Sequence, residues 1–255
     1  MKSEPSSRKS GLRVFLRSAR NAVLCTVILV QSALTHAQPQ AHSGARFAGL
    51  SQQADQAREA HDLDRAVQLY REALALRPRW AEGWWSLGTI YYDRNAYADA
   101  ARAFQRLVAV APNHGTGYAM LGLCQFELGQ DAAALQNIQA GRRLGLHKDP
   151  QLRAVVFYHE GLLFLRQHKF SSAQEVLTIL VRESVEETNA ELALGMSVLL
   201  VPPENEPPEG SIGRDIVVRV GRAEALGATK KFDEAKKIYA SVLERAVDFP
   251  NLHYA

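Results

Sequence analysis

Residues 81–114, AEGWWSLGTIYYDRNAYADAARAFQRLVAVAPNH, decide the fold of this chain. In the first half, apolar and small residues recur at the spacing of one helical face: Trp84, Leu87, Gly88 and Tyr91. In the second half the same spacing joins Ala100, Phe104 and Leu107. Residues 93–96 form the turn between these two predicted helices, and Pro112 ends the second helix because proline cannot continue it. Gly88 and Ala100 are small, so the two helix backbones can approach each other closely.

The same pattern recurs every 34 residues, and a fixed period of this length is typical of a repeat protein. Three columns keep the step over three copies: Ala66, Ala100 and Ala134; Tyr70, Phe104 and Ile138; Ala73, Leu107 and Gly141. Other columns keep it over two copies: Trp84 and Tyr118, Leu87 and Leu121, Gly88 and Gly122, Pro78 and Pro112. Several independent columns in one register are a specific signal, whereas a single match would be weak.

The pattern W-x2-L-G-x2-Y, followed by A-x3-F-x2-L-x4-P, resembles the tetratricopeptide repeat, and residues 81–114 supply each of its positions. The resemblance extends, with decay, over residues 47–250. It implies an all-α protein, a right-handed α-solenoid of helix-turn-helix repeats in which each repeat packs on its neighbours. It also implies a scaffold that binds other proteins, although repeat folds serve many purposes.

The repeat pattern divides the body of the chain into four segments. In order, they are four repeats at 47–187, a half-repeat plus a proline-rich loop at 188–212, a fifth full helical pair at 213–250, and the start of a truncated repeat at 251–255. Residues 201–212, VPPENEPPEGSI, are predicted to be loop because their four prolines interrupt any helix. Repeat arrays usually end in a polar capping helix, and none is visible before Ala255. We therefore expect the chain to be cut from a longer reading frame; the alternative is that a partner or another copy of the chain covers the open end.

The first 37 residues have the features of a signal peptide. A basic region precedes a mostly apolar stretch, NAVLCTVILVQS at 21–32, and Thr35 and Ala37 are the small residues that signal peptidase needs. We predict cleavage after Ala37, a linker at 38–46, and export to the periplasm or out of the cell. The apolar stretch is short for a bilayer-spanning helix. The alternative is an uncleaved N-terminal anchor, through which alone the chain would contact a membrane.

The charge distribution argues against a nucleic-acid-binding protein, and the cysteine count argues against an internal disulfide. The formal net charge is +3, but residues 1–37 carry +5, which leaves −2 for residues 38–255. The body therefore has no basic surplus for nucleic acid, and we expect no nucleic-acid partner. Cys25 and Cys124 lie on opposite sides of the predicted cleavage site, so no internal disulfide is expected. Cys124 falls inside a helical pattern, which favours a buried and inert thiol.

No group of residues in the sequence supports catalysis. His159-Glu160-Gly161-Leu162-Leu163 begins like the helix of a zinc protease, but leucine stands where the second histidine ligand is needed. Four other histidines fall at predicted turns, where solvated side chains are far commoner than metal ligands: His61, His114, His147 and His168. No glycine-rich phosphate loop and no nucleophile elbow occurs. We therefore predict no enzyme activity, no cofactor and no metal site.

The resemblance places a concave groove on the leading helix of each repeat, lined mainly by its second, fifth, ninth and twelfth positions. In repeats two to four these positions give the candidate partner-binding residues Trp85, Thr89, Tyr92, Leu123, Phe126, Tyr158 and Leu162, together with Ala119 and Leu165. Such aromatic and aliphatic side chains would suit an extended or helical apolar peptide. The alternative is that they pack against neighbouring helices or against residues 188–212. Asp55 stands at a position where carboxylate-binding members of the family carry asparagine, so a carboxylate clamp is not expected.

We therefore predict a non-enzymatic protein–protein interaction scaffold of the cell envelope. Its groove in repeats two to four would bind a peptide or helix of a protein partner whose identity the sequence does not give. The alternative is the adaptor portion of a larger or multi-chain enzyme whose catalytic part lies outside this chain. The missing capping helix motivates that alternative.

Overall fold

The computed structural model describes residues 43–146, 149–183, 188–245 and 249–254. All regular structure in these residues is helical, which confirms the predicted all-α class. The predicted signal peptide at 1–37 and the first part of the predicted linker, 38–42, lie outside the described residues. The chain divides into two compact units, whose described parts are residues 43–79 and residues from Trp80 onward.

The first unit is one pair of helices, over residues 43–59 and over Leu63–Leu76 (α2). Asp62 precedes α2, and its carboxylate accepts a hydrogen bond from the Arg65 N–H, one of the N–H groups that a helix start leaves unpaired. The Tyr70 hydroxyl donates to the Asp55 carboxylate over 2.6 Å, which ties the two helices together. The first of these helices is described from residue 43, four residues before the start of the first predicted repeat at 47.

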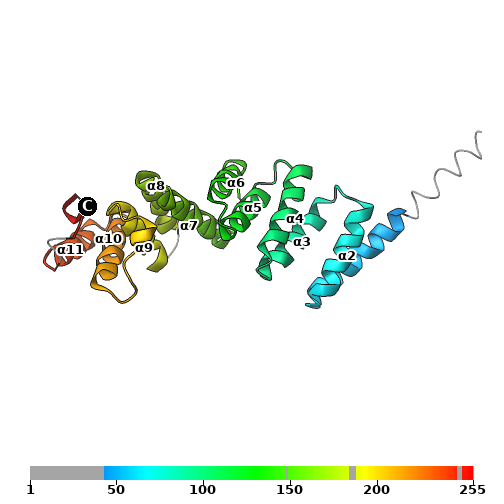
Figure 1. Cartoon of the computed structure of the whole chain (residues 1–255), viewed down its shortest axis with the longest axis horizontal. Helices are drawn as coiled ribbons and strands as arrows, with labels where there is room; N and C mark the ends of the chain where they lie inside the picture. The colour runs from blue at the N-terminus through cyan, green and yellow to red at the C-terminus, as the bar shows by residue number, and fades with distance from the viewer. Residues whose placement is uncertain (1–42, 147–148, 184–187, 246–248, 255) are drawn as a thin grey trace, which may run out of the picture. The chain divides into compact units, whose positions relative to one another are not determined.

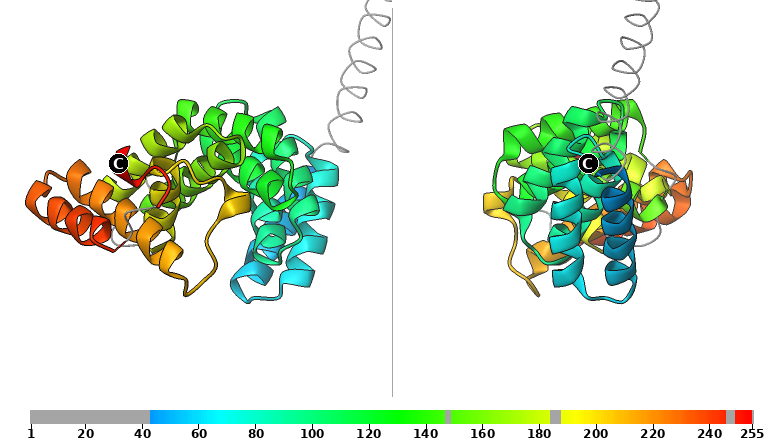
Figure 2. Two further views of the ribbon diagram at one scale, coloured as in Figure 1. Left: turned by 60° about the vertical axis from the view of Figure 1, so that its left-hand side comes forward. Right: turned by 90° about the vertical axis from the view of Figure 1, so that its right-hand side faces the viewer.

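The second unit begins with three antiparallel helix pairs joined by short turns (Figure 1). The pairs are α3 (Ala81–Asp93) with α4 (Tyr97–Val110), α5 (Gly115–Glu127) with α6 (Asp131–Leu144), and α7 (Pro150–Arg166) with α8 (Phe170–Glu183). The second helix of one pair contacts the first helix of the next, extensively between α4 and α5 and less between α6 and α7. Figure 2 shows the pairs stacked in chain order along this unit.

One register links five helix pairs, and it is set by the residue at which each turn reverses the chain. This turn residue has a left-handed φ of 55° to 69°: His61, Asn95, Gly129, His168 and Lys230. A small buried residue lies seven positions before it: Ala54, Gly88, Gly122, Gly161 and Ala223. A buried alanine lies five positions after it: Ala66, Ala100, Ala134, Ala173 and Ala235. A Cβ at Gly122 would lie 2.7 Å from Cγ1 of Ile138, so the small residues allow the two helices to touch.

The helix α9 (Thr188–Val198) is not followed by a short turn. A loop containing the 3-10 helix η1 (Pro203–Asn205) follows it, and then come α10 (Ile212–Ala228) and α11 (Phe232–Leu243). The backbones of α9 and α10 meet at two glycines: a Cβ at Gly195 would lie 1.8 Å from the Val217 carbonyl oxygen, and one at Gly221 equally near that of Glu191. Consequently α10 packs on α9 as well as on α11.

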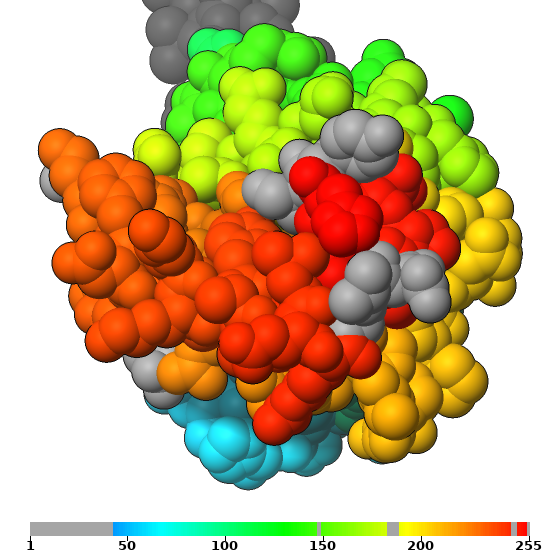
Figure 3. Space-filling view, turned by 90° about the vertical axis from the view of Figure 1, so that its left-hand side faces the viewer, coloured from blue at the N-terminus to red at the C-terminus, as the bar shows by residue number. Residues whose placement is uncertain are grey.

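The loop at 199–211 and the tail at 249–254 are tied to the helical body. Glu204 of the loop lies 3.3 Å from the His168 ring, and Arg214 of α10 donates to the Pro207 carbonyl oxygen over 3.1 Å. From the tail, which includes η2 (Leu252–Tyr254), the Asn251 amide donates to the Leu199 carbonyl oxygen over 2.9 Å. Figure 3 shows the tail in red between α11 and the yellow loop. The tail thus covers part of the C-terminal end of the solenoid.

Candidate functional site

The predicted binding residues form three columns on α3, α5 and α7, counted back from the turn residue of each pair. Ten positions before it lie Trp85, Ala119 and Tyr158; six before it, Thr89, Leu123 and Leu162; three before it, Tyr92, Phe126 and Leu165. Members of one column occupy equivalent places on successive helices. The arrangement therefore brings the candidate residues onto matching faces of the three leading helices.

The columns are not equally accessible. Six of the candidates are half-buried, so each offers part of its side chain to a partner: Trp85, Thr89, Tyr92, Phe126, Tyr158 and Leu162. Leu123 is only 2% exposed and belongs to the core, together with the fully buried Ala119 and Leu165. Leu123 therefore offers no surface to a partner. It lies in the middle of α5, where the surrounding helices cover the side chain. The accessible part of the face consists of α3 and α7 with Phe126 between them.

Trp85 has a second role besides surface contact. Its ring lies edge-on to the fully buried Phe104 of α4, with ring centres 5.7 Å apart, and 5.5 Å from the His114 ring. The His114 side chain in turn accepts a hydrogen bond from the Gly117 N–H at the start of α5. Trp85 thus helps to join two consecutive pairs, and replacing it would disturb packing as well as surface.

Tyr92 lies near two acidic side chains, Asp93 and Glu127. Its ring packs edge-on against Tyr97, with centres 5.6 Å apart. Burial raises the pKa of Tyr92 to about 12, and the charges of Glu127 and Asp93 act in the same direction. The phenol therefore stays protonated at every physiological pH and can donate a hydrogen bond to a partner.

An aromatic cluster joins α5 to α7. The Phe126 and His159 rings meet edge-on with centres 4.6 Å apart, and the Arg166 guanidinium lies 4.2 Å from the centre of the Phe126 ring. Tyr158 packs edge-on against His159 at 5.6 Å, and Arg166 also forms an ion pair with Asp131 at 2.9 Å. The Phe126 ring therefore contacts both an aromatic neighbour and a cation.

Sequence reasoning singled out His159 only as part of a failed metal motif, and it missed Arg166. In the structure His159 Nδ1 lies 2.7 Å from the Val155 carbonyl oxygen, and burial lowers the pKa of His159. A usable signal was present, since His159 follows the candidate Tyr158 and Arg166 lies one helical turn after Leu162. Both residues were missed because the candidates come from the second, fifth, ninth and twelfth positions of each repeat, and neither His159 nor Arg166 falls at one of them.

The described part of the chain contains no group of histidine, cysteine and carboxylate side chains that could hold a metal ion. Cys124 is fully buried, and burial raises the pKa of its thiol to about 12. A thiol in this state is a poor nucleophile because the thiolate is the reactive form. Among the described helices, none combines the length and apolar character that crossing a membrane requires.

The stacked pairs and their shared register define a helical-repeat protein. A family model of the tetratricopeptide repeat matches residues 51–113 and 87–145. Residues 51–145 are therefore tetratricopeptide repeats, as their residue pattern predicts. No curated protein sequence matches the chain.

Solved structures share the fold at low sequence identity. MamA is 20% identical, with a TM-score of 0.55 over 80% of this chain and 93% of MamA. YrrB, a tetratricopeptide-repeat protein described as having an unusual peptide-binding site, is 18% identical, with a TM-score of 0.53 over 72% of this chain and 87% of YrrB. A tetratricopeptide-repeat protein from Parabacteroides merdae is 16% identical, with a TM-score of 0.52 over 82% of this chain and 83% of its own. These similarities concern the fold.

Proposed function

We propose that this protein is a non-enzymatic scaffold that binds a segment of a protein partner on the α3–α5–α7 face, here called the leading-helix face. Its accessible residues are Trp85, Thr89, Tyr92, Phe126, Tyr158 and Leu162. Tetratricopeptide repeats generally serve as protein–protein interaction modules, which the family match supports. The observation that carries the specific proposal is the half-buried aromatic cluster of Phe126, Tyr158 and His159 on successive leading helices.

The chemistry of this face suits an apolar peptide that also carries hydrogen-bond acceptors. Aromatic rings contribute large contact areas at low entropic cost, and residues of this kind dominate binding energy in protein interfaces. The protonated Tyr92 phenol adds a donor at one end of the face, whereas the Thr89 hydroxyl already donates to the Ser86 carbonyl oxygen over 2.9 Å and can accept a hydrogen bond. YrrB, which shares the fold, is described as having a peptide-binding site, and this analogy supports the proposal.

Site-specific photocrosslinking tests the proposal directly. A photoreactive amino acid at Thr89 or Leu162 should capture a discrete partner from a native extract, because both side chains are half-buried on the leading-helix face. The matched control has the same photoreactive amino acid at Gln105, which is exposed on α4. It should not capture the partner that Thr89 and Leu162 capture. Equal capture from all three positions, or capture from Gln105 alone, would place the binding site elsewhere.

Substitution provides the second arm of the test. Tyr92→Ala combined with Tyr158→Ala should remove partner binding while leaving helicity unchanged, since neither ring is fully buried. This pair is preferable to any variant of Trp85, whose ring contacts the core at Phe104. Phe232→Ala on α11, where the ring is 64% exposed, is the control for loss of surface apolar area and should leave binding intact.

The cellular location is part of the same proposal. The basic region, the apolar stretch at 21–32 and the small residues Thr35 and Ala37 support export through a cleaved signal peptide. The scaffold would then act in the cell envelope or outside the cell. N-terminal sequencing of protein recovered from the fractionated host tests this: a new N-terminus at Gln38 is expected, and an intact Met1 in the cytoplasm would contradict export.

A further inference from the structure

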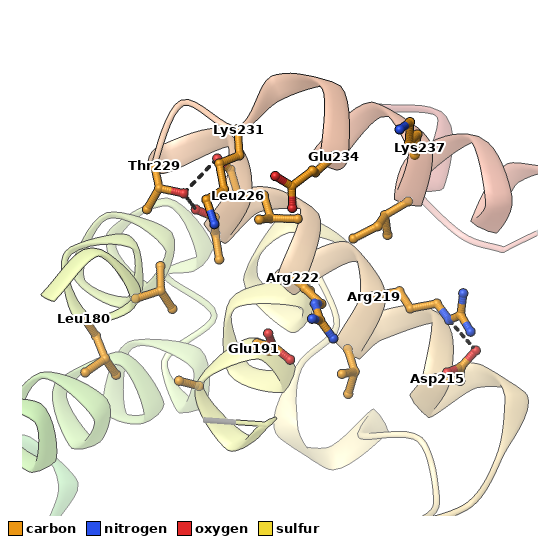
Figure 4. Close-up of a pocket in the computed structure, with 15 residues that line it drawn as sticks. Leu180, Glu191, Asp215, Arg219, Arg222, Leu226, Thr229, Lys231, Glu234 and Lys237 are labelled. Carbon is orange, nitrogen blue, oxygen red and sulfur yellow. Dashed lines mark hydrogen bonds and ion pairs between the residues drawn. The ribbon is translucent and has the colours of Figure 1, made fainter. Parts of the chain in front are cut away.

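A second site lies at the other end of the same unit, independent of the leading-helix face. A pocket of about 750 Å³ opens between α8, α9, α10 and α11 (Figure 4). Its apolar part includes Leu180 and Val181 of α8, Leu226 of α10 and Ile238 of α11. Its charged part surrounds Arg222, which Figure 4 shows in the middle of the pocket. We call it the C-terminal pocket.

The shared register explains why a pocket forms at this place. Eight positions before the turn residue, three first helices carry Leu121, Glu160 and Arg222. Thirteen positions after the turn residue, the second helices that precede them carry Val108, Arg142 and Val181. The ion pair between Arg142 and Glu160 shows that these two positions face each other across a junction between pairs.

The three junctions differ in how the two positions match. Val108 and Leu121 are both apolar and buried, and Arg142 with Glu160 forms an ion pair. At the third junction Val181 and Arg222 do not match, and both line the C-terminal pocket. The additional helix α9 packs on α10 here and separates the two sides. The pocket is therefore a junction that the chain's own described side chains leave unfilled.

The cations of the C-terminal pocket exceed its carboxylates. Arg219 forms an ion pair with Asp215 at 2.8 Å, so this pair is internally neutral. Arg222, Lys231 and Lys237 also line the pocket, and none of them forms an ion pair with a described residue. Glu191 and Glu234 are the remaining carboxylates of the lining. Three cations against two carboxylates leave a positive surplus, and Arg222, beside which Figure 4 shows Glu191, can bind a carboxylate through two parallel hydrogen bonds.

We propose that the C-terminal pocket binds an acidic, partly apolar segment of a partner protein. A carboxylate of that segment binds Arg222 and takes the role that Glu160 has for Arg142 at the preceding junction. An adjacent aliphatic side chain covers Val181, Leu226 and Ile238. Lys231 and Lys237 at the rim attract the acidic segment and orient it. The pocket volume is within the ~300–1,000 Å³ range of ordinary ligand pockets, enough for a few side chains.

Fluorescence anisotropy with two matched peptide pools tests this proposal on the full-length protein. One pool consists of labelled decapeptides with two glutamates flanking leucine or isoleucine, and the second pool has glutamine in place of each glutamate. The glutamate pool should bind at least tenfold more tightly, and raising the ionic strength should weaken its binding but not that of the glutamine pool. Tyr92→Ala with Tyr158→Ala should leave this binding unchanged, which separates the C-terminal pocket from the leading-helix face.

Charge reversal identifies the site. Arg222→Glu with Lys237→Glu should weaken binding of the glutamate pool at least tenfold, and a third pool with lysine for glutamate should then bind the variant but not the wild type. Lys236→Glu is the matched control, because Lys236 is exposed on α11 next to Lys237 and does not line the pocket. Both variants change exposed side chains, so circular dichroism should show an intact fold. Equal binding of the glutamate and glutamine pools, no binding of either, or an unchanged affinity of the Arg222 variant would each overturn the proposal.

Discussion

Two junctions of the same repeat array are sealed by different chemistry. Between α4 and α5, Val108 and Leu121 are buried at 9% and 6% exposure, and a Cβ at Gly117 would lie 2.9 Å from Cδ2 of Leu107. Between α6 and α7, the equivalent residues Arg142 and Glu160 form an ion pair with the carboxylate only 2% exposed. The register positions are the same, but one junction is apolar and the other ionic.

The difference follows from how closely the helices approach. The α4–α5 contact is extensive, so burial of apolar area can hold it. The α6–α7 contact is smaller, and the turn residues Gly129 and His168 lie 39 positions apart, whereas Asn95 and Gly129 lie 34 apart. There the Arg142 guanidinium also lies 4.4 Å from the centre of the Phe157 ring. A buried ion pair contributes little net free energy, because both charges lose water, but it accepts only one arrangement of the helices. We infer that the ion pair fixes the alignment of α6 and α7 where apolar area is scarce.

The largest effect is expected from placing a charge in the apolar junction. Leu121→Glu should lower the free energy of unfolding by about 3–5 kcal/mol, because Val108 cannot neutralise a buried carboxylate. Urea denaturation followed by circular dichroism measures the change, and Gln136→Glu at an exposed site of α6 is the control. Adding Val108→Arg should recover part of the loss by recreating the ionic pair. A loss no larger than that of the control would show that the two positions do not face a dry junction.

A smaller effect is expected from breaking the ionic junction. Glu160→Gln should lower the free energy of unfolding by about 1–3 kcal/mol, since Arg142 keeps part of its exposure and can still reach water. Replacing both partners, Arg142→Val with Glu160→Leu, copies the apolar junction and should be neutral or stabilising by up to about 4 kcal/mol. If the double variant is instead less stable than Glu160→Gln alone, the α6–α7 spacing does not tolerate apolar packing.

The stability of the protein should also depend on pH through His159 of α7, the helix that carries Glu160. Burial lowers the pKa of His159, which packs on Phe126 near Glu127 and Arg166. The unfolded chain therefore binds this proton at a higher pH than the folded chain does. The contribution of neutral His159 is complete above its ordinary pKa of about 6.5 and declines as the pH falls below it. The urea midpoint of the wild type should fall between pH 7.5 and pH 5 by more than that of His159→Gln. Equal falls would assign the dependence to other groups.

The sequence was sufficient for the all-α class and for the repeat, because small residues such as Gly88 and Ala100 and the turn spacing are local signals. It could not show that Leu123 is buried while its column partners Thr89 and Leu162 are not, since exposure depends on how consecutive helices pack. The same reason applies to the C-terminal pocket. Arg222 looks like an ordinary surface residue until the packing of α9 on α10 is known.

The smallest effect on stability is expected at the exposed edge of the α6–α7 junction. Comparing it with the effect of Glu160→Gln shows whether burial or charge causes the larger losses of stability. Arg166 pairs with Asp131 at 2.9 Å, but both side chains are more than a third exposed. Arg166→Gln should therefore lower the free energy of unfolding by at most about 1 kcal/mol, with Arg143→Gln at an exposed site of α6 as the control. Arg166 also covers the Phe126 ring, so partner binding on the leading-helix face should change more than stability does. A loss as large as that of Glu160→Gln would mean that charge, rather than burial, determines the strength of this junction.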